Sequence, residues 1–219
     1  MELKKLIEKE YSQLLSSYPK LMKPVYQGNL WRIDGSIDVI DDEEGYWDTY
    51  QVSIFLPPGY PKDIPVLQET SEKIKRDINW HMSRAGFCCL GTRAKIFYDL
   101  SDGITLLKWL DKFAHPFLAN HVFRIKTGSY ADEEFSHGTK GIIEWWEKIS
   151  GLNGAVAILQ HLRQISGYRT QALNRPCFCE SGKKYKRCYE INPSGHRYMI
   201  SCKEIESDID SIRKYLGKQ

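Results

Sequence analysis

The sequence lacks three features that would each assign it to a broad class of protein. Its formal net charge is only +3, so no excess of positive charge indicates nucleic-acid binding. No apolar run approaches the length that crosses a bilayer, and the start MELKKLIEKEY is amphipathic and charged, unlike a secretory signal. No glycine-rich phosphate-binding motif of the P-loop or dinucleotide type is present. These absences predict a cytoplasmic protein that binds neither nucleic acid nor membranes directly.

Cysteine is present but unevenly distributed. Cytoplasmic thiols are normally reduced, so the six cysteines indicate reactive or metal-binding groups rather than a disulfide framework. Their division into two groups predicts two separate chemistries. Cys88 and Cys89 are adjacent, whereas the other four lie within the last fifth of the chain: Cys177, Cys179, Cys188 and Cys202.

The pattern of apolar residues predicts an α+β fold. A content of 42% hydrophobic and 27% charged residues is typical of a globular protein. A helical stripe comes first, then an alternating meander with a turn at Asp34-Gly35, a proline-rich segment and further helices. The expected helices span 2–16, 103–114, 139–149, 154–166 and a last stripe through Ile205, Ile209, Ile212 and Leu216, and the expected strands span 24–33, 36–40 and 46–55.

Three segments in the first half of the chain resemble the ubiquitin-conjugating enzyme family. They are GYPKDIP at 59–65, His81 and FCCLG at 87–91, and they follow the expected helix and meander. In that family a YPxxxP turn leads into an extended segment, a histidine precedes the nucleophile, and leucine follows the nucleophilic cysteine. The resemblance covers residues 2–118 and implies a UBC-like fold with Cys89 as the thioester-forming nucleophile. The segment SHGTKGIIEWWEKI at 136–149 looks like the tail of bacterial members from antiphage operons.

A thioester carrier needs an accessible thiol that attacks an activated carboxyl group and then yields to an amine. Cys89 is the candidate, and Arg84 and Arg93 are close enough in sequence to favour its thiolate. We expect Cys88, by contrast, to lie in the core or beneath the site, as free cysteines often do.

The second step builds an oxyanion that needs a hydrogen-bond donor. Family members often place asparagine two residues after the histidine, whereas this chain has Ser83 there, so Ser83 or Asn79 would have to replace it. An acidic residue can orient or deprotonate the incoming lysine, and Asp99 and Asp102 are the candidates. His81 either takes part in this chemistry or holds the loop through a hydrogen bond of its ring.

The stretch CFCESGKKYKRC at 177–188 resembles the SEC-C metal-binding motif, a zinc knuckle. Closely spaced thiolates around a glycine turn suit tetrahedral zinc, which implies a structural zinc ion. Tyr189 stands where the motif has a fourth ligand, so His196 or Cys202 would have to supply it; the alternative is a knuckle that no longer binds metal. The expected ligands are therefore Cys177, Cys179, Cys188 and either Cys202 or His196.

These patterns predict two domains, a ubiquitin-conjugating-like domain with a helical extension at 1–167 and a knuckle with a terminal helix at 168–219. By resemblance, Cys89 would carry the C-terminal carboxyl of a ubiquitin-like protein or of a cyclic GMP-AMP synthase-like nucleotidyltransferase in CBASS antiphage signalling. Without a phosphate-binding motif, the chain would need a separate activating enzyme or a pre-activated substrate, or would follow an unusual mechanism.

Two alternatives to a transferase remain open on the sequence. The first is a scaffold that binds a partner's tail without catalysis. The second is a cysteine hydrolase that pairs Cys89 with a downstream histidine; the candidates are His115, His121 and His137.

Overall fold

The computed structural model describes residues 2–40, 45–131, 135–171, 184, 200 and 202–218. Contacts within the chain group it into two compact units, the first formed by residues 1–90 and 103–134 and the second by 91–102 and 135–219. The described residues form a four-stranded antiparallel sheet and several helices, which confirms the predicted α+β class.

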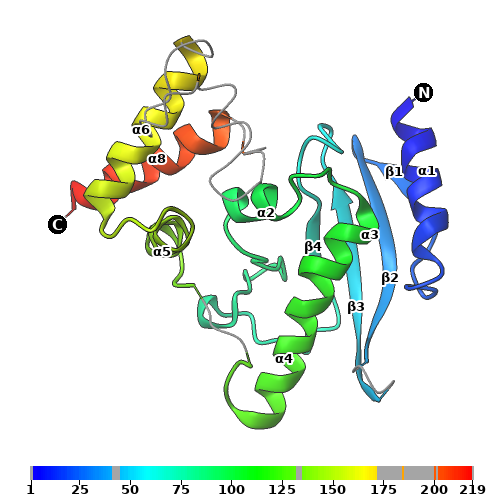
Figure 1. Ribbon diagram of the computed structural model, residues 1–219. Helices are drawn as coiled ribbons and strands as arrows, with labels where there is room; N and C mark the ends of the chain where they lie inside the picture. The colour runs from blue at the N-terminus through cyan, green and yellow to red at the C-terminus, as the bar shows by residue number, and fades with distance from the viewer. Residues whose placement is uncertain are drawn as a thin grey trace. The chain divides into compact units, whose positions relative to one another are not determined.

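The first unit contains the sheet. Its strands lie in the order β1-β2-β3-β4, and each strand pairs antiparallel with the next (Figure 1). Gly28 and Asn29, both with positive φ, form the tight turn between the first two strands. The strands are β1 (Val25–Gln27), β2 (Leu30–Ile40), β3 (Tyr46–Leu56) and β4 (Val66–Glu69).

The predicted turn at Asp34-Gly35 is wrong, because β2 runs without interruption through both residues. Gly35 is needed there for a different reason. Leu21 forms a bridge to Gly35, and a Cβ atom at position 35 would lie 2.4 Å from the carbonyl oxygen of Lys20. Gly35 also has a φ of 148°. The glycine therefore allows a close approach of two backbones rather than a chain reversal.

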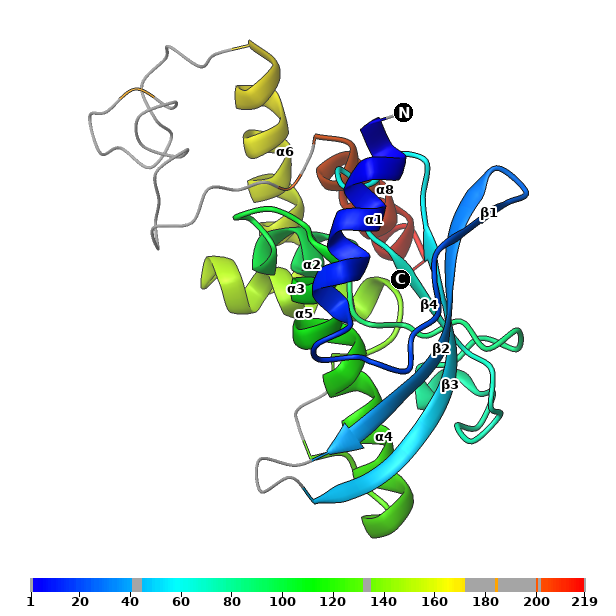
Figure 2. The same cartoon turned by 90° about the vertical axis from the view of Figure 1, so that its right-hand side faces the viewer.

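Helices cover one face of this sheet. The predicted N-terminal helix is confirmed as α1 (Glu2–Leu14), and Figure 2 shows it on the same side of the sheet as α3 (Leu106–Trp109) and α4 (His115–Thr127). A π-helical segment, Leu110–Ala114, joins α3 to α4, so the helix predicted at 103–114 begins later and extends further. Alternating strand residues fill the space beneath the helices, as the pleat of a strand requires. The fully buried ones include Ile33, Ile37, Tyr50 and Ile54.

A buried carboxylate fastens the proline-rich segment to the helices. Glu10 lies on the buried side of α1, accepts a hydrogen bond from the Tyr60 hydroxyl, and accepts another from the backbone N–H of Leu106 at 2.9 Å. The Tyr60-Pro61 peptide bond is cis. Since an unpaired carboxylate is costly to bury, these donors explain why Glu10 is tolerated there. One side chain thus joins α1, the loop after β3 and the start of α3.

The second unit is helical. The predicted helices at 139–149 and 154–166 and the C-terminal stripe are confirmed as α5, α6 and α8, whereas α2 was not predicted. The Trp146 indole donates to the carboxylate of Asp208 at 2.8 Å, and Trp145 packs edge-on against Tyr98. These contacts join α5 to α8 and to α2. The helices are α2 (Arg93–Asp99), α5 (Thr139–Ser150), α6 (Ala155–Gln171) and α8 (Cys202–Leu216).

The predicted boundary between 1–167 and 168–219 stays a prediction. Helix α6 continues through Gly167 to Gln171, and residues 172–183 lie outside the described ranges. Among the helices in the described part of the chain, none combines the length and apolar character needed to span a bilayer.

Candidate active site

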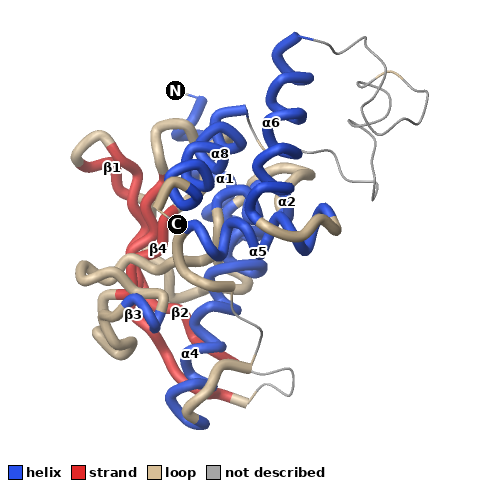
Figure 3. Tube along the Cα trace, turned by 90° about the vertical axis from the view of Figure 1, so that its left-hand side faces the viewer, coloured by secondary structure: helices blue, strands red, loops and turns tan. Residues whose placement is uncertain are grey.

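The candidate nucleophile lies in an irregular segment between β4 and α2, most of which is loop (Figure 3). A 3-10 turn at Ile78–Trp80 ends at His81, whose left-handed backbone, with φ of 49°, reverses the chain. After the reversal Met82 pairs with Cys88. The N–H of Cys89 then donates to the His81 carbonyl at 2.8 Å, so backbone hydrogen bonds fix the nucleophile's position.

Cys88 and Cys89 point to opposite sides of this extended stretch. Cys89 is exposed, whereas Cys88 is half-buried, with Sγ 3.8 Å from the Gly86 carbonyl oxygen. Burial raises the pKa of the Cys88 thiol to about 12, so at neutral pH this thiol is protonated. Since the thiolate is the nucleophile, Cys88 is poorly suited to that role, and Cys89 is the more accessible thiol of the pair.

Beneath the nucleophile segment lies a buried ion pair. The Glu69 side chain, which has no exposed surface, lies 2.7 Å from the Arg76 guanidinium. Arg76 also donates a hydrogen bond to the Glu69 backbone carbonyl. Gly86 lies against the same carbonyl group, because a Cβ atom at position 86 would be 2.6 Å from its oxygen. The Glu69–Arg76 ion pair therefore holds the end of β4 next to Cys88, and it leaves room only for glycine at position 86.

The candidate oxyanion donors differ in how they are engaged. Ser83 is used within the loop, since its hydroxyl accepts from the Phe87 N–H at 2.9 Å. Asn79 is exposed, and its carboxamide has no hydrogen-bond partner among the described residues. Asn79 is therefore the better candidate. His81 contributes its carbonyl to Cys89, and its ring packs edge-on against Tyr130.

Of the charged candidates, only Arg84 belongs to the same unit as Cys89, in which it is exposed. Arg93, Asp99 and Asp102 belong to the second unit. The Arg93 guanidinium there binds the Glu204 carboxylate through two nitrogens, at 2.9 and 3.0 Å. Lys95 donates to Asp99 at 2.5 Å, and Asp102 is exposed at the end of this segment. Their proposed roles toward Cys89 stay predictions.

The histidine candidates for a hydrolase base give little support to that alternative. His121 is only 1% exposed, and its ring nitrogens lie 2.8 and 2.9 Å from the carbonyl oxygens of Phe117 and Trp80. Both nitrogens are therefore occupied by structural contacts. His115 packs edge-on against Tyr18, and His137 belongs to the second unit.

The expected zinc ligands stay predictions. Cys177, Cys179, Cys188 and His196 lie outside the described residues, and Cys202 is the first residue of α8. Within the described ranges, no group of three histidine, cysteine or acidic side chains is placed to bind a metal ion.

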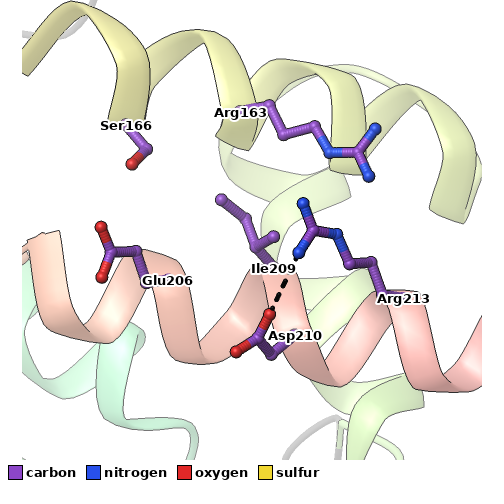
Figure 4. A pocket seen from close by; sticks show the side chains of 6 residues that line it. All are labelled: Arg163, Ser166, Glu206, Ile209, Asp210 and Arg213. Atoms are coloured by element: carbon purple, nitrogen blue, oxygen red, sulfur yellow. Dashed lines mark hydrogen bonds and ion pairs between the residues drawn. The ribbon is translucent and has the colours of Figure 1, made fainter.

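A cavity of about 330 Å³ lies in the second unit between α6 and α8 (Figure 4). Two guanidinium groups face one another at one end, and Ser166 lies across from Glu206 at the other. Arg213 pairs with Asp210 at 3.4 Å, so the lining carries two positive and two negative charges and favours no charge of ligand. The lining residues are Arg163, Ser166, Glu206, Ile209, Asp210 and Arg213.

Sequence reasoning missed buried polar residues that hold loops of the first unit in place. One signal was present: Glu10 and His121 interrupt apolar helical stripes, Glu10 between Ile7 and Leu14, and His121 beside Leu118. A polar side chain in such a stripe indicates a buried partner. The partners themselves are far away in sequence and have no local signature.

Comparison of the chain with protein-family models, with curated proteins and with solved structures finds no match.

Proposed function

We propose that this chain is a cysteine-dependent acyl transferase of the ubiquitin-conjugating type. The observation that carries the proposal is the contrast between two adjacent thiols: Cys89 is exposed and fixed by its backbone, whereas Cys88 is half-buried and protonated. The sequence resemblance around Tyr60, His81 and Cys89 supports the same assignment. The α+β sheet with helices on one face is compatible with it.

In the first step the Cys89 thiolate attacks the carbonyl carbon of an activated carboxyl group. A carbon–sulfur bond forms and the bond to the leaving group breaks. The leaving group is AMP if the carboxyl group is activated as an acyl adenylate, or the thiolate of a donor enzyme if it is activated as a thioester. Because the sequence has no phosphate-binding glycine motif, the proposal requires a separate activating enzyme, a pre-activated substrate or an unusual mechanism of activation.

In the second step an amine attacks the thioester carbon. A carbon–nitrogen bond forms, the carbon–sulfur bond breaks, and Cys89 leaves as a thiolate while the amine loses a proton. The carboxamide of Asn79 supplies the donor for the transient oxyanion. The sequence-based candidate for orienting or deprotonating the amine is Asp102, an exposed carboxylate of the second unit. His81 acts through its carbonyl, which fixes Cys89.

The proposed substrate is the C-terminal carboxyl of a cyclic GMP-AMP synthase-like nucleotidyltransferase or of a ubiquitin-like protein. The proposed setting is CBASS antiphage signalling in the cytoplasm. These assignments rest on the resemblance of the sequence. A structural zinc ion would be held by Cys177, Cys179 and Cys188 with Cys202 or His196. The other function to consider is a scaffold that binds the same tail without forming a covalent bond.

Intact-mass analysis of the chain isolated from its native host tests the proposal. We expect a fraction of molecules to carry the mass of the partner less one water, and thiol reagents to remove it. Cys88→Ala should keep this adduct, Cys89→Ala should abolish it, and Cys89→Ser should give an ester that resists reductant.

Two results would count against the transferase. If the wild-type chain never carries an adduct, the scaffold is favoured. If Cys89→Ala carries as much adduct as the wild type, the acyl group lies on another residue and the assignment of Cys89 is wrong.

A further inference from the structure

Helix α4 and the loop after it hold the 3-10 turn that precedes His81. The Arg124 guanidinium lies between two aromatic rings, 4.1 Å from the centroid of Trp80 and 4.3 Å from that of Tyr130. It also donates to the backbone carbonyl of Asn79 at 2.6 Å. A planar guanidinium can stack on two rings and donate in its own plane at once, whereas an ammonium cannot.

His121 fixes the next carbonyl of the same turn. Its Nε2 lies 2.9 Å from the Trp80 carbonyl oxygen and 3.0 Å from the Tyr130 hydroxyl. Arg124 and His121 therefore hold two successive peptide groups, those of Asn79 and Trp80, against α4. The next residue is His81.

The orientation of His81 decides where Cys89 lies. Its left-handed backbone aims its carbonyl oxygen at the Cys89 N–H, 2.8 Å away, and starts the pairing of Met82 with Cys88. A non-glycine residue in this conformation is strained by about 1 kcal/mol or more, so it persists only where neighbouring contacts enforce it. The contacts of Arg124 and His121 on the two preceding residues supply that enforcement.

We propose that Arg124 is a positioning residue for Cys89. It acts through the turn Ile78–Trp80 and the carbonyl of His81 rather than by contact with the reacting atoms. This role rests on the proposed function, because it matters only if Cys89 carries an acyl group. By holding Asn79 it also positions the side chain that donates to the oxyanion.

Hydrogen exchange at the Cys89 amide tests the positioning without any partner. We expect Arg124→Gln to speed this exchange by about tenfold or more, since it removes a charge-assisted hydrogen bond and two ring contacts. Arg124→Lys, which keeps the charge but not the planar donor, should have an intermediate effect. The amide of Ile54 in the core of β3 should exchange at the wild-type rate in both variants.

Lys126→Gln is the matched control. Lys126 lies on the same helix and over an aromatic ring, 4.8 Å from the centroid of Trp47, but no described contact joins it to the turn. It should leave the Cys89 amide unchanged. If Arg124→Gln and Lys126→Gln give the same exchange at Cys89, Arg124 does not position the nucleophile.

The adduct on Cys89 in host cells separates this inference from the proposed function. We expect Arg124→Gln to lower the adduct fraction by about fivefold or more, in line with the loss of one oriented contact, while Lys126→Gln keeps it. Faster exchange with a normal adduct fraction would show that Arg124 is only structural. A wild-type chain with no adduct would reject the transferase, whereas a normal wild-type adduct that Arg124→Gln leaves unchanged would reject only the positioning role.

Discussion

Two buried carboxylates, Glu69 in the first unit and Asp208 in the second, are held in different ways. In the first unit Glu69 is paired with the guanidinium of Arg76, and Ser71 donates a hydroxyl to it. In the second unit Asp208 accepts one indole N–H from Trp146. Burial, opposed in part by that hydrogen bond and reinforced by the charge of Glu204, raises the pKa of Asp208 to about 6.

The difference lies in the charge of the partner: a guanidinium for Glu69 and a neutral indole for Asp208. The hydrogen bond between a carboxylate and a guanidinium is charge-assisted, and it is stronger than one from a neutral donor. A carboxylate with one neutral donor and an acidic neighbour changes its charge near pH 6. The segment proposed for chemistry thus lies next to the ion-paired carboxylate.

Gly86→Ala would break the first arrangement most severely. The new Cβ would lie 2.6 Å from the Glu69 carbonyl oxygen and 3.1 Å from the Arg76 guanidinium, on a residue with a φ of 84°. We expect a loss of about 4 kcal/mol in the free energy of unfolding, measured by urea denaturation. Gly128→Ala is the control, because its φ is 88° but nothing lies within 4 Å of the new Cβ. A loss of only about 1 kcal/mol there would isolate the contact with the ion pair.

Comparing Glu69→Gln with Asp208→Asn tests whether the two carboxylates really differ. Glu69→Gln leaves Arg76 without its counter-ion in a mostly buried position, so we expect a loss of about 3 kcal/mol in the free energy of unfolding at pH 7. Asp208→Asn retains an acceptor for Trp146 and removes a buried charge beside Glu204, so at pH 7 we expect a gain of up to about 3 kcal/mol rather than a loss. Equal losses in urea denaturation would contradict the comparison.

The pH dependence of stability tests the titration of Asp208 directly. Because the pKa of Asp208 is raised from 3.8 to about 6, the folded chain binds a proton more tightly than the unfolded chain does. The resulting stabilisation of about 3 kcal/mol is complete below pH 3.8 and is lost as pH rises through 6. Urea denaturation between pH 4 and 7 should show this fall, and its difference from Asp208→Asn isolates the contribution of this residue. If Asp208→Asn shows the same dependence of stability on pH as the wild type, Asp208 is not the group that causes it.

Local patterns in the sequence predicted the parts of the fold that depend on neighbouring residues. The apolar stripe of α1, the alternation along β3 and the stripe of α8 each correspond to a buried face. The prediction at Gly35 was wrong because the local sequence does not distinguish a glycine in a turn from a glycine that allows another backbone segment to pass close by. The short helix α2 was missed because seven residues carry too little periodicity to be recognised.

The candidate site was predictable only in part, for a similar reason. Cys89 was found through its neighbours in the sequence, and its exposure agrees with the expected role of a nucleophile. Its support was not found, because Arg124 lies 45 residues from Asn79 and His121 lies 41 residues from Trp80. Such pairs depend on how the helix crosses the sheet, which no local pattern encodes.

The hydrogen bonds of Glu10 have a consequence for the order in which the chain matures. The carboxylate of Glu10 is made early in synthesis, but its two donors, Tyr60 and Leu106, follow 50 and 96 residues later. Until both donors have left the ribosome, burial of the Glu10 carboxylate is unfavourable, so this face of α1 remains exposed to solvent. Removal of α1 from the folded protein would leave the Tyr60 hydroxyl and the Leu106 amide without their acceptor. An affinity tag should therefore be added before residue 1 and should not replace residues of α1.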